Sequence, residues 1–596
     1  METFENVTTQ RPDHAARLAA LRAELTRLGV DGLLVPRADE HLGEYVPPSA
    51  ERLAWLSGFT GSAGLGLVLP DRAVLFTDGR YTVQAAQQTD PTLWQRAHIT
   101  ETPPHAWLAE HAPGLRIGYD PWLHTEAALA RFAAVTLVPL AANPVDAIWH
   151  DRPAPPAAPA IAHPLAFAGR PAEEKRAEAA AALAAAKEDA AVLADPHAAA
   201  WLLNLRGGDL AHTPLCLAMA ILHADGRVAL FADPAKFGPE VRAHLGAAVA
   251  IAPRAALPDA LDSLAGRTVR CDPDRTPAAI LARLRAAGAR VTANEDPTVL
   301  PRARKNAVEQ QGARAAHRRD AAAMARFLAW FAAEAPKGGL TEMAAAERLR
   351  AFRAEAPEFR GESFPAIAGA GEHGAIVHYR ATPDSDRPIR PGEPFLIDSG
   401  AQYPDGTTDI TRTLWVEGAG DPPAELVERA TRVLKGHLAL AALRFPEGVA
   451  GPHLDAIARA PLWQAGLDYD HGTGHGVGSF LSVHEGPAAF SRAAKPVPLG
   501  EGMILSDEPG FYEAGRYGIR IENLLLVRRE PGTARPFLCF ETLTLVPYDR
   551  RLIAPGLLSP AERAQVDAYH ARVRAEIGPL LDAAARAWLE AATAPL

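Results

Sequence analysis

Acidic residues gather at strand ends in the second half of the chain. Asp398 closes the apolar run 394–397, and Asp409 follows the Pro-Asp-Gly turn at 404–406, so we expect one carboxylate on each arm of a hairpin. Neighbouring strands lie about 5 Å apart, which would let the two carboxylates share a hard divalent cation. For this pair alone, two solvated or turn-capping aspartates are the alternative.

One glycine-rich segment, 471–478, has the sequence His-Gly-Thr-Gly-His-Gly-Val-Gly. No Gly-Lys-Ser/Thr follows it, so a phosphate-binding loop is disfavoured, and the glycines are expected to let the backbone approach something closely. His475 could ligate a metal ion through one ring nitrogen, and His484 could reach the same cavity. Structural roles are the alternative for a single histidine, but three histidines within fourteen residues favour a site.

Two more carboxylates follow strand-like segments. Glu508 comes after the apolar segment 503–506, and Glu522 lies in the alternating segment 517–524 with Arg520 on the same face. An exposed Arg–Glu face is the alternative. Four carboxylates and one imidazole suit two hard or borderline divalent ions that share bridging carboxylates, most simply manganese, with cobalt or zinc as alternatives. The sequence therefore predicts a dinuclear hydrolase whose metal ligands are Asp398, Asp409, His475, Glu508 and Glu522.

Similar helix and strand patterns occur twice before this region. Apolar spacing predicts a helix over 14–28 and a strand over 32–35, and the same succession returns over 172–193. The tripeptide Ala-Trp-Leu at 54–56 is repeated at 200–202. These matches indicate two similar α/β domains in tandem, although chance matching in an Ala- and Leu-rich chain is the alternative.

Boundaries follow from composition. The proline-rich segment 152–164 predicts a linker, and a long helix is expected to begin near Arg302. We therefore expect domains at 1–152, 165–300 and 301–596, and an overall α/β (α+β) fold class.

Composition restricts the partners and the compartment. The 596 residues are 48% hydrophobic and 22% charged, which is typical of a soluble protein with several cores. Because 61 Lys and Arg face 71 Asp and Glu, no basic surplus favours nucleic acid or a membrane surface as a partner. The three distant cysteines fit a reducing compartment, and neither a secretory signal nor a membrane-length apolar run is visible, so we expect a cytoplasmic protein.

Taken together, these motifs resemble the pita-bread metallopeptidases. The order Asp, Asp, His, Glu, Glu, the glycine-rich segment, Glu-Pro-Gly and Gly-Ile-Arg-Ile-Glu-Asn are similar to those of the three-domain X-Pro aminopeptidases, or aminopeptidases P. The likeness extends to 58–64 and 77–81 in the first domain and to 201–207 in the second. It implies two creatinase-like N-terminal domains, a pita-bread catalytic domain and a homodimer.

The resemblance also implies a role for each residue. Asp398 would hold one metal ion, His475 and Glu508 the other, and Asp409 and Glu522 would bridge both. The expected catalytic residues are Glu508, as proton acceptor, with His484 and His378. The expected substrate contacts are Arg80, His378, His484, Arg520 and Tyr512. The Phe511-Tyr512 pair could wall a proline pocket or belong to the core.

The implied reaction releases the N-terminal residue from peptides with proline in second position, by a hydroxide bridging two metal ions. A prolidase that cuts X-Pro dipeptides and a non-catalytic peptide-binding relative are the alternatives.

Overall fold

The computed structural model describes residues 13–418 and 420–596, which divide into two compact units. The first unit contains the described residues up to Pro156 together with Leu261–Ala265 and Asp272–Ala289. The second contains Ala157–Ala260, Gly266–Cys271 and Arg290–Leu596. The N-terminal segment 1–12, where we saw no secretory signal, lies outside the described residues.

A six-stranded sheet forms the centre of the first unit. Its order is β4-β3-β2-β1-β5-β6; the two pairs β1–β2 and β2–β3 are antiparallel, and the other neighbours are parallel. The strands are β1 (Gly32–Pro36), β2 (Leu65–Val68), β3 (Ala73–Thr77), β4 (Gln95–His98), β5 (Arg116–Tyr119) and β6 (Thr136–Pro139).

The second unit opens with a sheet of the same topology. Its order is β12-β11-β10-β8-β13-β14, again with two antiparallel pairs beside the central strand β8. The strands are β8 (Ala190–Leu193), β10 (Met219–His223), β11 (Val228–Phe231), β12 (Val249–Ala252), β13 (Thr268–Cys271) and β14 (Arg290–Ala293). The predicted duplication is thus confirmed at the level of strand order and direction.

Helices flank these sheets, and they include the two that the sequence predicted, over 14–28 and from 172. The first begins after the N-cap Asp13 and ends at Gly29, which adopts the left-handed conformation that favours glycine. The helices are α1 (His14–Leu28), α2 (Arg52–Ser57), α3 (Thr82–Gln88), α4 (Pro104–His111), α5 (Glu126–Leu129), α6 (Pro144–Ile148), α7 (Leu165–Ala168), α8 (Ala172–Ala185), α9 (Pro196–Leu202), α10 (Pro239–Leu245), α11 (Leu257–Asp262), α12 (Ala278–Ala286) and α13 (Val299–Ala303).

Helix α12 belongs to the first unit, although the sequence placed residues 165–300 together. The amide of Ala278 donates to the carbonyl oxygen of His124 at 2.8 Å. Arg285 forms an ion pair with Glu126. The remaining short strands before the catalytic region, β7 (Ile161–Ala162) and β9 (Leu205–Arg206), pair with each other.

The long helix α14 (Ala307–Glu334) begins five residues after the predicted start at Arg302. The reason is a capping box: the Asn306 side chain accepts from the Glu309 amide, and the Glu309 carboxylate accepts from the Asn306 amide. The other helices of this region are α15 (Glu342–Ala354), α16 (Ala424–Ala441), α17 (Gly451–Trp463), α18 (Pro560–Ile577) and α19 (Ala583–Ala592).

Short, mostly antiparallel strands fill the rest of the region. They form the sheets β16-β17-β20, β15-β18-β19, β21-β28-β27-β24, β22-β23 and β25-β26. Their bounds are β15 (Gly361–Glu362), β16 (Ile367–Ala370), β17 (Pro394–Ser399), β18 (Ala401–Tyr403), β19 (Gly406–Thr407), β20 (Ile410–Trp415), β21 (Arg444–Pro446), β22 (Gly474–His475), β23 (Ala489–Phe490), β24 (Ile504–Asp507), β25 (Gly510–Glu513), β26 (Tyr517–Arg520), β27 (Asn523–Arg529) and β28 (Phe537–Thr542).

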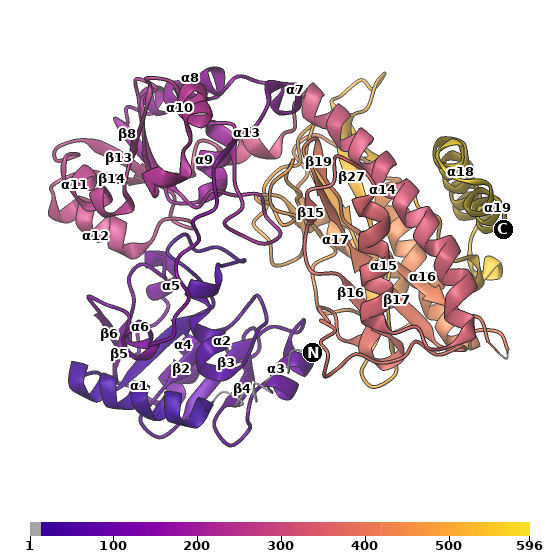
Figure 1. Cartoon of the computed structure of the whole chain (residues 1–596), viewed down its shortest axis with the longest axis horizontal. Helices are drawn as coiled ribbons and strands as arrows, with labels where there is room; N and C mark the ends of the chain where they lie inside the picture. The colour runs from indigo at the N-terminus through magenta and orange to yellow at the C-terminus, as the bar shows by residue number, and fades with distance from the viewer. Residues whose placement is uncertain (1–12, 419) are drawn as a thin grey trace, which may run out of the picture. The chain divides into compact units, whose positions relative to one another are not determined.

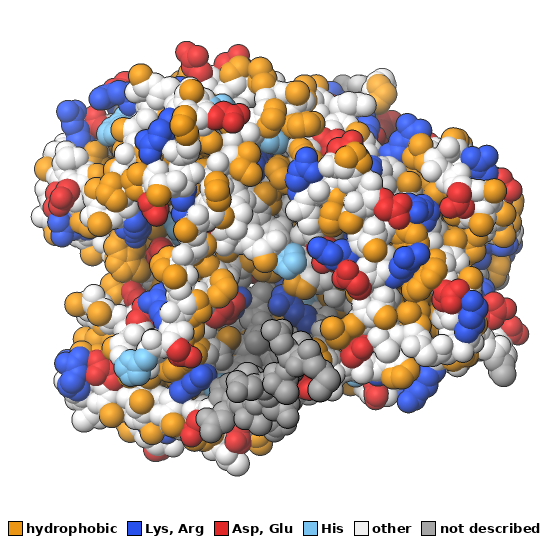
Figure 2. All heavy atoms as spheres, in the orientation of Figure 1, with side chains coloured by type: hydrophobic (Ala, Val, Ile, Leu, Met, Phe, Trp, Pro, Cys, Tyr) orange, Lys and Arg blue, Asp and Glu red, His pale blue; other side chains and the backbone are white. Residues whose placement is uncertain are grey.

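Helices α14 and α15 pack side by side against the β16-β17-β20 sheet (Figure 1). Their shared core includes Phe331 stacked on Phe395 of β17, with ring centroids 4.8 Å apart. The strand that carries Asp398 therefore rests on an apolar support. On the face shown in Figure 2, acidic and basic side chains are interspersed. No helix in the described part of the chain has the length and apolar character needed to cross a bilayer.

Candidate metal centre

Two aspartates meet where the hairpin arms β17 and β20 pair. Asp398 on β17 lies opposite Thr411 of β20, and Asp409 directly precedes β20. Both residues are buried, at 7% and 4% exposure. One oxygen of Asp398, Oδ2, accepts from Nη2 of Arg520 at 2.6 Å. The predicted hairpin with one carboxylate on each side is confirmed.

His475 and Glu508 approach this pair from the glycine-rich segment and from the end of β24. The Nε2 atom of His475 lies 3.5 Å from Oδ2 of Asp409 and 3.4 Å from Oε1 of Glu508. Its Nδ1 atom lies 3.0 Å from the carbonyl oxygen of Gly476, which can only accept, so Nδ1 carries the proton and Nε2 of the neutral ring remains for a metal ion. A Cβ on Gly474 would overlap the carbonyl of Ser506, so only glycine permits this approach.

Glu522 completes the group from the break between β26 and β27. Its Oε2 atom accepts from the Thr411 hydroxyl at 2.8 Å, and its amide donates to the Thr411 carbonyl at 3.1 Å. Ligating atoms of Asp409, His475 and Glu522 all lie within 4.8 Å of one another. Residues that are 113 positions apart in sequence, Asp409 and Glu522, thus converge on one point.

The carboxylates of this group fit divalent cations. Oδ1 of Asp398 and Oδ1 of Asp409 are buried and have no hydrogen-bond partner, an arrangement that costs free energy unless a cation binds there. Burial, followed by the negative charge of Asp398, raises the pKa of Asp409. Burial, followed by the charges of Asp409, Glu508 and Asp398, raises the pKa of Glu522 well above its usual range.

For His475, burial and the neighbouring carboxylates shift the pKa in opposite directions. Burial acts to lower its pKa, but the Asp409 and Glu508 carboxylates outweigh that effect and raise it. The chain therefore concentrates negative charge here, of which Arg520 offsets part at Asp398, and the raised pKa values of Asp409 and Glu522 show that those two carboxyl groups favour bound protons in the absence of metal. Hard oxygen donors with one imidazole are the donor set expected for manganese, cobalt or zinc.

Three of the predicted substrate residues, His484, His378 and Arg80, lie in three different parts of the structure. His484 lies beside the metal group, with its ring 4.3 Å from that of His475. His378 lies in the turn after β16, next to the buried Tyr379, whose hydroxyl donates to Glu342 at 2.8 Å. Arg80 is in the first unit, where its guanidinium pairs with Asp78 at 2.7 Å. Substrate contact by these three residues stays a prediction.

Arg520 and Tyr512 lie beneath the carboxylates. Arg520 is 1% exposed, which contradicts the alternative of an exposed Arg–Glu face. Its Nη1 atom donates to the Tyr512 hydroxyl at 2.7 Å, and that hydroxyl lies 2.8 Å from Nε2 of His471. Burial raises the pKa of Tyr512 to about 12. These bonds make Arg520 a support for Asp398, and substrate contact by either residue stays a prediction. Phe511 packs in a hydrophobic core with Leu434, which agrees with the alternative that this residue belongs to the core.

Two supporting residues had no assignment from sequence. The Thr411 hydroxyl holds Glu522 and accepts from Nε of Arg520 at 3.1 Å. The Ser506 hydroxyl accepts from the His475 amide at 2.9 Å and donates to Oε1 of Glu508 at 3.0 Å. Ser506 lies on β24, two residues before Glu508, which follows that strand. The two-residue period of a strand puts their side chains on the same face, and it was the signal that could have identified Ser506.

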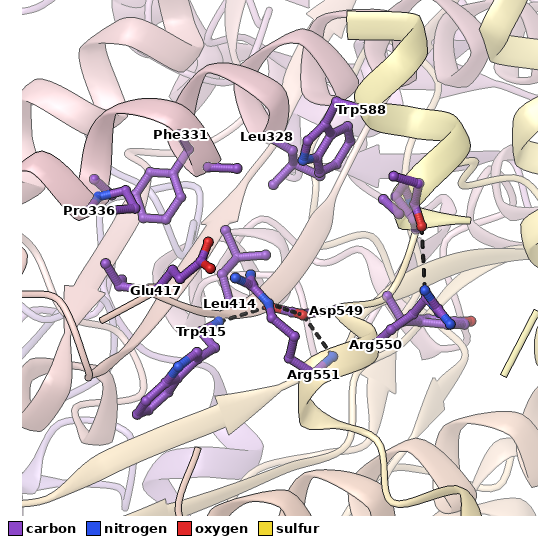
Figure 3. A pocket seen from close by; sticks show the side chains of 17 residues that line it. Leu328, Phe331, Pro336, Leu414, Trp415, Glu417, Asp549, Arg550, Arg551 and Trp588 are labelled. Atoms are coloured by element: carbon purple, nitrogen blue, oxygen red, sulfur yellow. Dashed lines mark hydrogen bonds and ion pairs between the residues drawn. The ribbon is translucent and has the colours of Figure 1, made fainter. Parts of the chain in front are cut away.

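A cavity of about 320 Å³ lies elsewhere in the catalytic region, between α14, β20 and α19 (Figure 3). None of the five predicted ligands lines it. Three of its charged side chains have partners: Arg551 pairs with Asp549 at 2.7 Å, and Arg550 donates to the carbonyls of Ala591 and Pro595. The metal group is therefore the stronger candidate for chemistry.

Family comparisons agree with this organisation. Residues 311–529 match metallopeptidase family M24, and residues 536–596 match the C-terminal region of peptidase M24. Residues 17–147 and 151–309 each match a creatinase/prolidase N-terminal domain. The creatinase-like, pita-bread fold class expected from sequence is confirmed.

Relatives match over almost the whole chain. "Aminopeptidase P2" of Arabidopsis thaliana is 39% identical over 96% of this chain and 86% of its own length. "Probable Xaa-Pro aminopeptidase P" of Neosartorya fischeri is 40% identical over 97% and 92%. The crystal structure of an X-prolyl aminopeptidase from Caenorhabditis elegans, described as a cytosolic enzyme with a di-nuclear active site, superimposes with a TM-score of 0.93 at 33% identity, covering 98% of this chain and 100% of that one. The chain therefore belongs to metallopeptidase family M24, among its Xaa-Pro aminopeptidases.

Proposed function

We propose that this chain is a dinuclear metalloaminopeptidase that releases the N-terminal residue from peptides with proline in second position. The main support is one observation: four carboxylates and His475 come together, and Oδ1 of Asp398 and Oδ1 of Asp409 are buried there without a hydrogen-bond partner. Family membership and the X-Pro aminopeptidase relatives support the same activity.

The donor set assigns the chain's residues to two divalent ions. We assign Asp398 to one ion, His475 and Glu508 to the other, and Asp409 and Glu522 to both, with manganese as the preferred metal. Bound there, the ions supply Lewis-acid catalysis and lower the pKa of a water ligand. Arg520 and Thr411 hold the Asp398 and Glu522 carboxylates in position.

Glu508 is the proposed proton acceptor. Its side chain is 17% exposed, against 10% for Asp398 and 5% for Asp409, so an incoming peptide reaches it more easily than it reaches those aspartates. We assign His484 as the donor of a hydrogen bond to the scissile carbonyl oxygen, which its position 4.3 Å from the ring of His475 supports, and His378 to the carbonyl of the proline residue. Arg80 is assigned as a further substrate contact, as the resemblance to X-Pro aminopeptidases implies.

We extend the proposal to organisation and setting. We propose the sequence division into 1–152, 165–300 and 301–596, with helix α12 of the second region packed in the first unit, and a homodimer that acts in the cytoplasm. The relative from Caenorhabditis elegans is described as cytosolic, which supports the compartment. Closed twofold dimers are the commonest soluble oligomers, which supports the assembly.

One experiment tests the activity directly. Metal-depleted protein is reconstituted with Mn²⁺, and turnover is compared for Arg-Pro-Pro and for the dipeptide Arg-Pro. The proposal expects tripeptide turnover that tracks metal content. Turnover of the dipeptide alone would identify a prolidase, and no turnover at two ions per chain would identify a binding relative.

A further inference from the structure

One loop of the catalytic region carries His484 and also contacts the hydrophobic core of the β8–β14 sheet. Residues 478–486, here called the His484 loop, follow β22 and contain no regular strand or helix. Loops without ladder hydrogen bonds are generally mobile, yet a catalytic group must be held within a fraction of an ångström. The loop has a few backbone bonds of its own, such as that from the Gly478 amide to the Ser482 carbonyl at 2.9 Å, and Gln402 of β18 donates to the Leu481 carbonyl at 2.7 Å. Further attachments come from the region around the β8–β14 sheet.

Leu481, three residues before His484, is inserted in the hydrophobic core beneath the β8–β14 sheet. It is 1% exposed and packs in the same cluster as Leu205 and Leu215. Its neighbour Phe480 has a φ of +49°, which is unfavourable for a bulky side chain, so surrounding contacts must hold it there. The Phe480 ring lies 5.7 Å from His163, a residue of the segment that leads into this sheet.

Arg206 of β9 clamps the same loop through its backbone. Nε of Arg206 donates to the carbonyl of Phe480 at 2.5 Å, and Nη2 donates to the carbonyl of Ser479 at 3.0 Å. The side chain is buried, and Nη1 donates to the carbonyl of Leu205 at 2.8 Å. A buried guanidinium is costly unless its donors are satisfied, so this arrangement commits the residue to the loop.

A third attachment reaches the residue next to His484. The Glu485 carboxylate lies 2.6 Å from Nζ of Lys305 and 3.5 Å from Nε of Arg302. Arg302 also lies 3.2 Å from Asp195, which caps the N-terminus of α9 beside the β8–β14 sheet. Buried ion pairs of this kind fix relative geometry, because losing one partner leaves the other charge uncompensated.

We propose that the region around the β8–β14 sheet acts in catalysis by positioning His484, with Arg206 and Leu481 as the positioning residues. The inference rests on the proposed function of His484 and deepens it. Arg206 holds the loop backbone, Leu481 anchors its side chain, and His484 is displaced when either attachment is lost. The region thus has a task in the reaction although it supplies none of the assigned metal ligands.

The test compares four variants of the full-length metal-loaded protein with wild type. Arg206→Met keeps an unbranched apolar stem without the guanidinium donors, and Leu481→Ala removes the anchor. Arg206→Lys restores a donor and should recover part of the loss. Ile221→Ala is the matched control, because Ile221 is buried in β10 on the face opposite Ala220 and Leu222, which pack with Leu481.

We expect Arg206→Met and Leu481→Ala to lower kcat for Arg-Pro-Pro by about ten- to a hundredfold, the range for misplacing a catalytic group by about 1 Å. Both should keep two metal ions per chain and a KM close to wild type. Amide hydrogen exchange should accelerate in 478–486. Ile221→Ala should lower thermal stability and leave kcat unchanged.

Two outcomes are distinguished by including His484→Ala. If His484→Ala keeps its metal and its kcat, the proposed role of His484 is wrong. If His484→Ala loses kcat but Arg206→Met and Leu481→Ala do not, the positioning inference is overturned. An equal loss in Ile221→Ala would also overturn it, since general destabilisation would then explain the effect. Should Arg206→Met fail to fold, Leu481→Ala and the milder Leu481→Val decide by the same kcat criterion.

Discussion

Replacing Thr411 by valine would remove one hydroxyl and almost no volume. That hydroxyl donates to Oε2 of the buried Glu522 and accepts from Nε of Arg520. The backbone bond from the Glu522 amide to the Thr411 carbonyl would remain, so the segment between β26 and β27 that carries Glu522 should keep its place. The substitution therefore isolates the orientation of one assigned bridging carboxylate.

The size of the effect follows from the bond that is lost. A hydrogen bond to a charged group contributes about 1.5–3 kcal/mol, which corresponds to about a 10- to 150-fold weaker dissociation constant for metal. Removing a residue that orients a metal ligand costs affinity in the same range, about 10- to 100-fold. We therefore expect Thr411→Val to bind Mn²⁺ at least about tenfold more weakly.

Calorimetric titration of metal-depleted protein with Mn²⁺ measures this affinity. Thr413→Val is the control, because Thr413 lies on the same face of β20 and its hydroxyl bonds only the backbone of Arg520. Thr413→Val should lower stability and leave Mn²⁺ affinity within about threefold of wild type. Equal Mn²⁺ affinity in Thr411→Val and wild type would refute the role of Thr411.

Four further predictions follow from the assigned roles. Chelation should abolish activity and Mn²⁺ or Co²⁺ should restore it, while Asp409→Ala or Glu522→Ala should lose both ions in elemental analysis; full turnover by metal-free protein contradicts this. His484→Ala should keep its metal and lose kcat about a hundredfold or more, whereas His475→Ala should lose metal; the opposite pattern reverses their roles. Arg-Pro-Pro should exceed Arg-Ala-Pro in kcat/KM by tens- to thousands-fold, since ring contacts and an unpaired N–H together account for about 2–5 kcal/mol, and near-equal values indicate a general aminopeptidase. Sedimentation should show a dimer, and monomer alone at assay concentration would exclude it.

The sequence predicted the carboxylate group because chemistry and chain geometry coincide there. Asp398 and Glu508 stand near or just after the ends of apolar strands, and Asp409 directly precedes β20, the strand that pairs with the one carrying Asp398. The two-residue period of a strand put Arg520 and Glu522 on one face, but it did not indicate which element packs against that face. Burial of both residues came from packing against β20, which is distant in sequence.

Other features depended on partners that a linear pattern does not contain. The Tyr512 hydroxyl bonds Arg520 and His471, and the hydrophobicity of the ring gave no indication of that pairing; substrate contact by Tyr512 stays a prediction. The start of α14 was predicted near Arg302, which lies in the separate short helix α13, whereas the Asn306 capping box sets the start at Ala307. The attachment of Leu481 joins positions more than 250 residues apart in the sheet core, beyond the reach of any local signal.

Helix α12 has a consequence for the order in which the chain folds during synthesis. It is completed at Ala286, yet its contacts with His124 and Glu126 belong to the first unit, whose other described segments lie mostly before Pro156. At about 5–20 residues per second, the ribosome needs on the order of ten seconds to make the intervening chain. The first unit must wait for that time with one surface unfilled. A truncation in the linker 152–164 would leave the same surface bare, so an isolated N-terminal fragment should aggregate unless α12 is supplied.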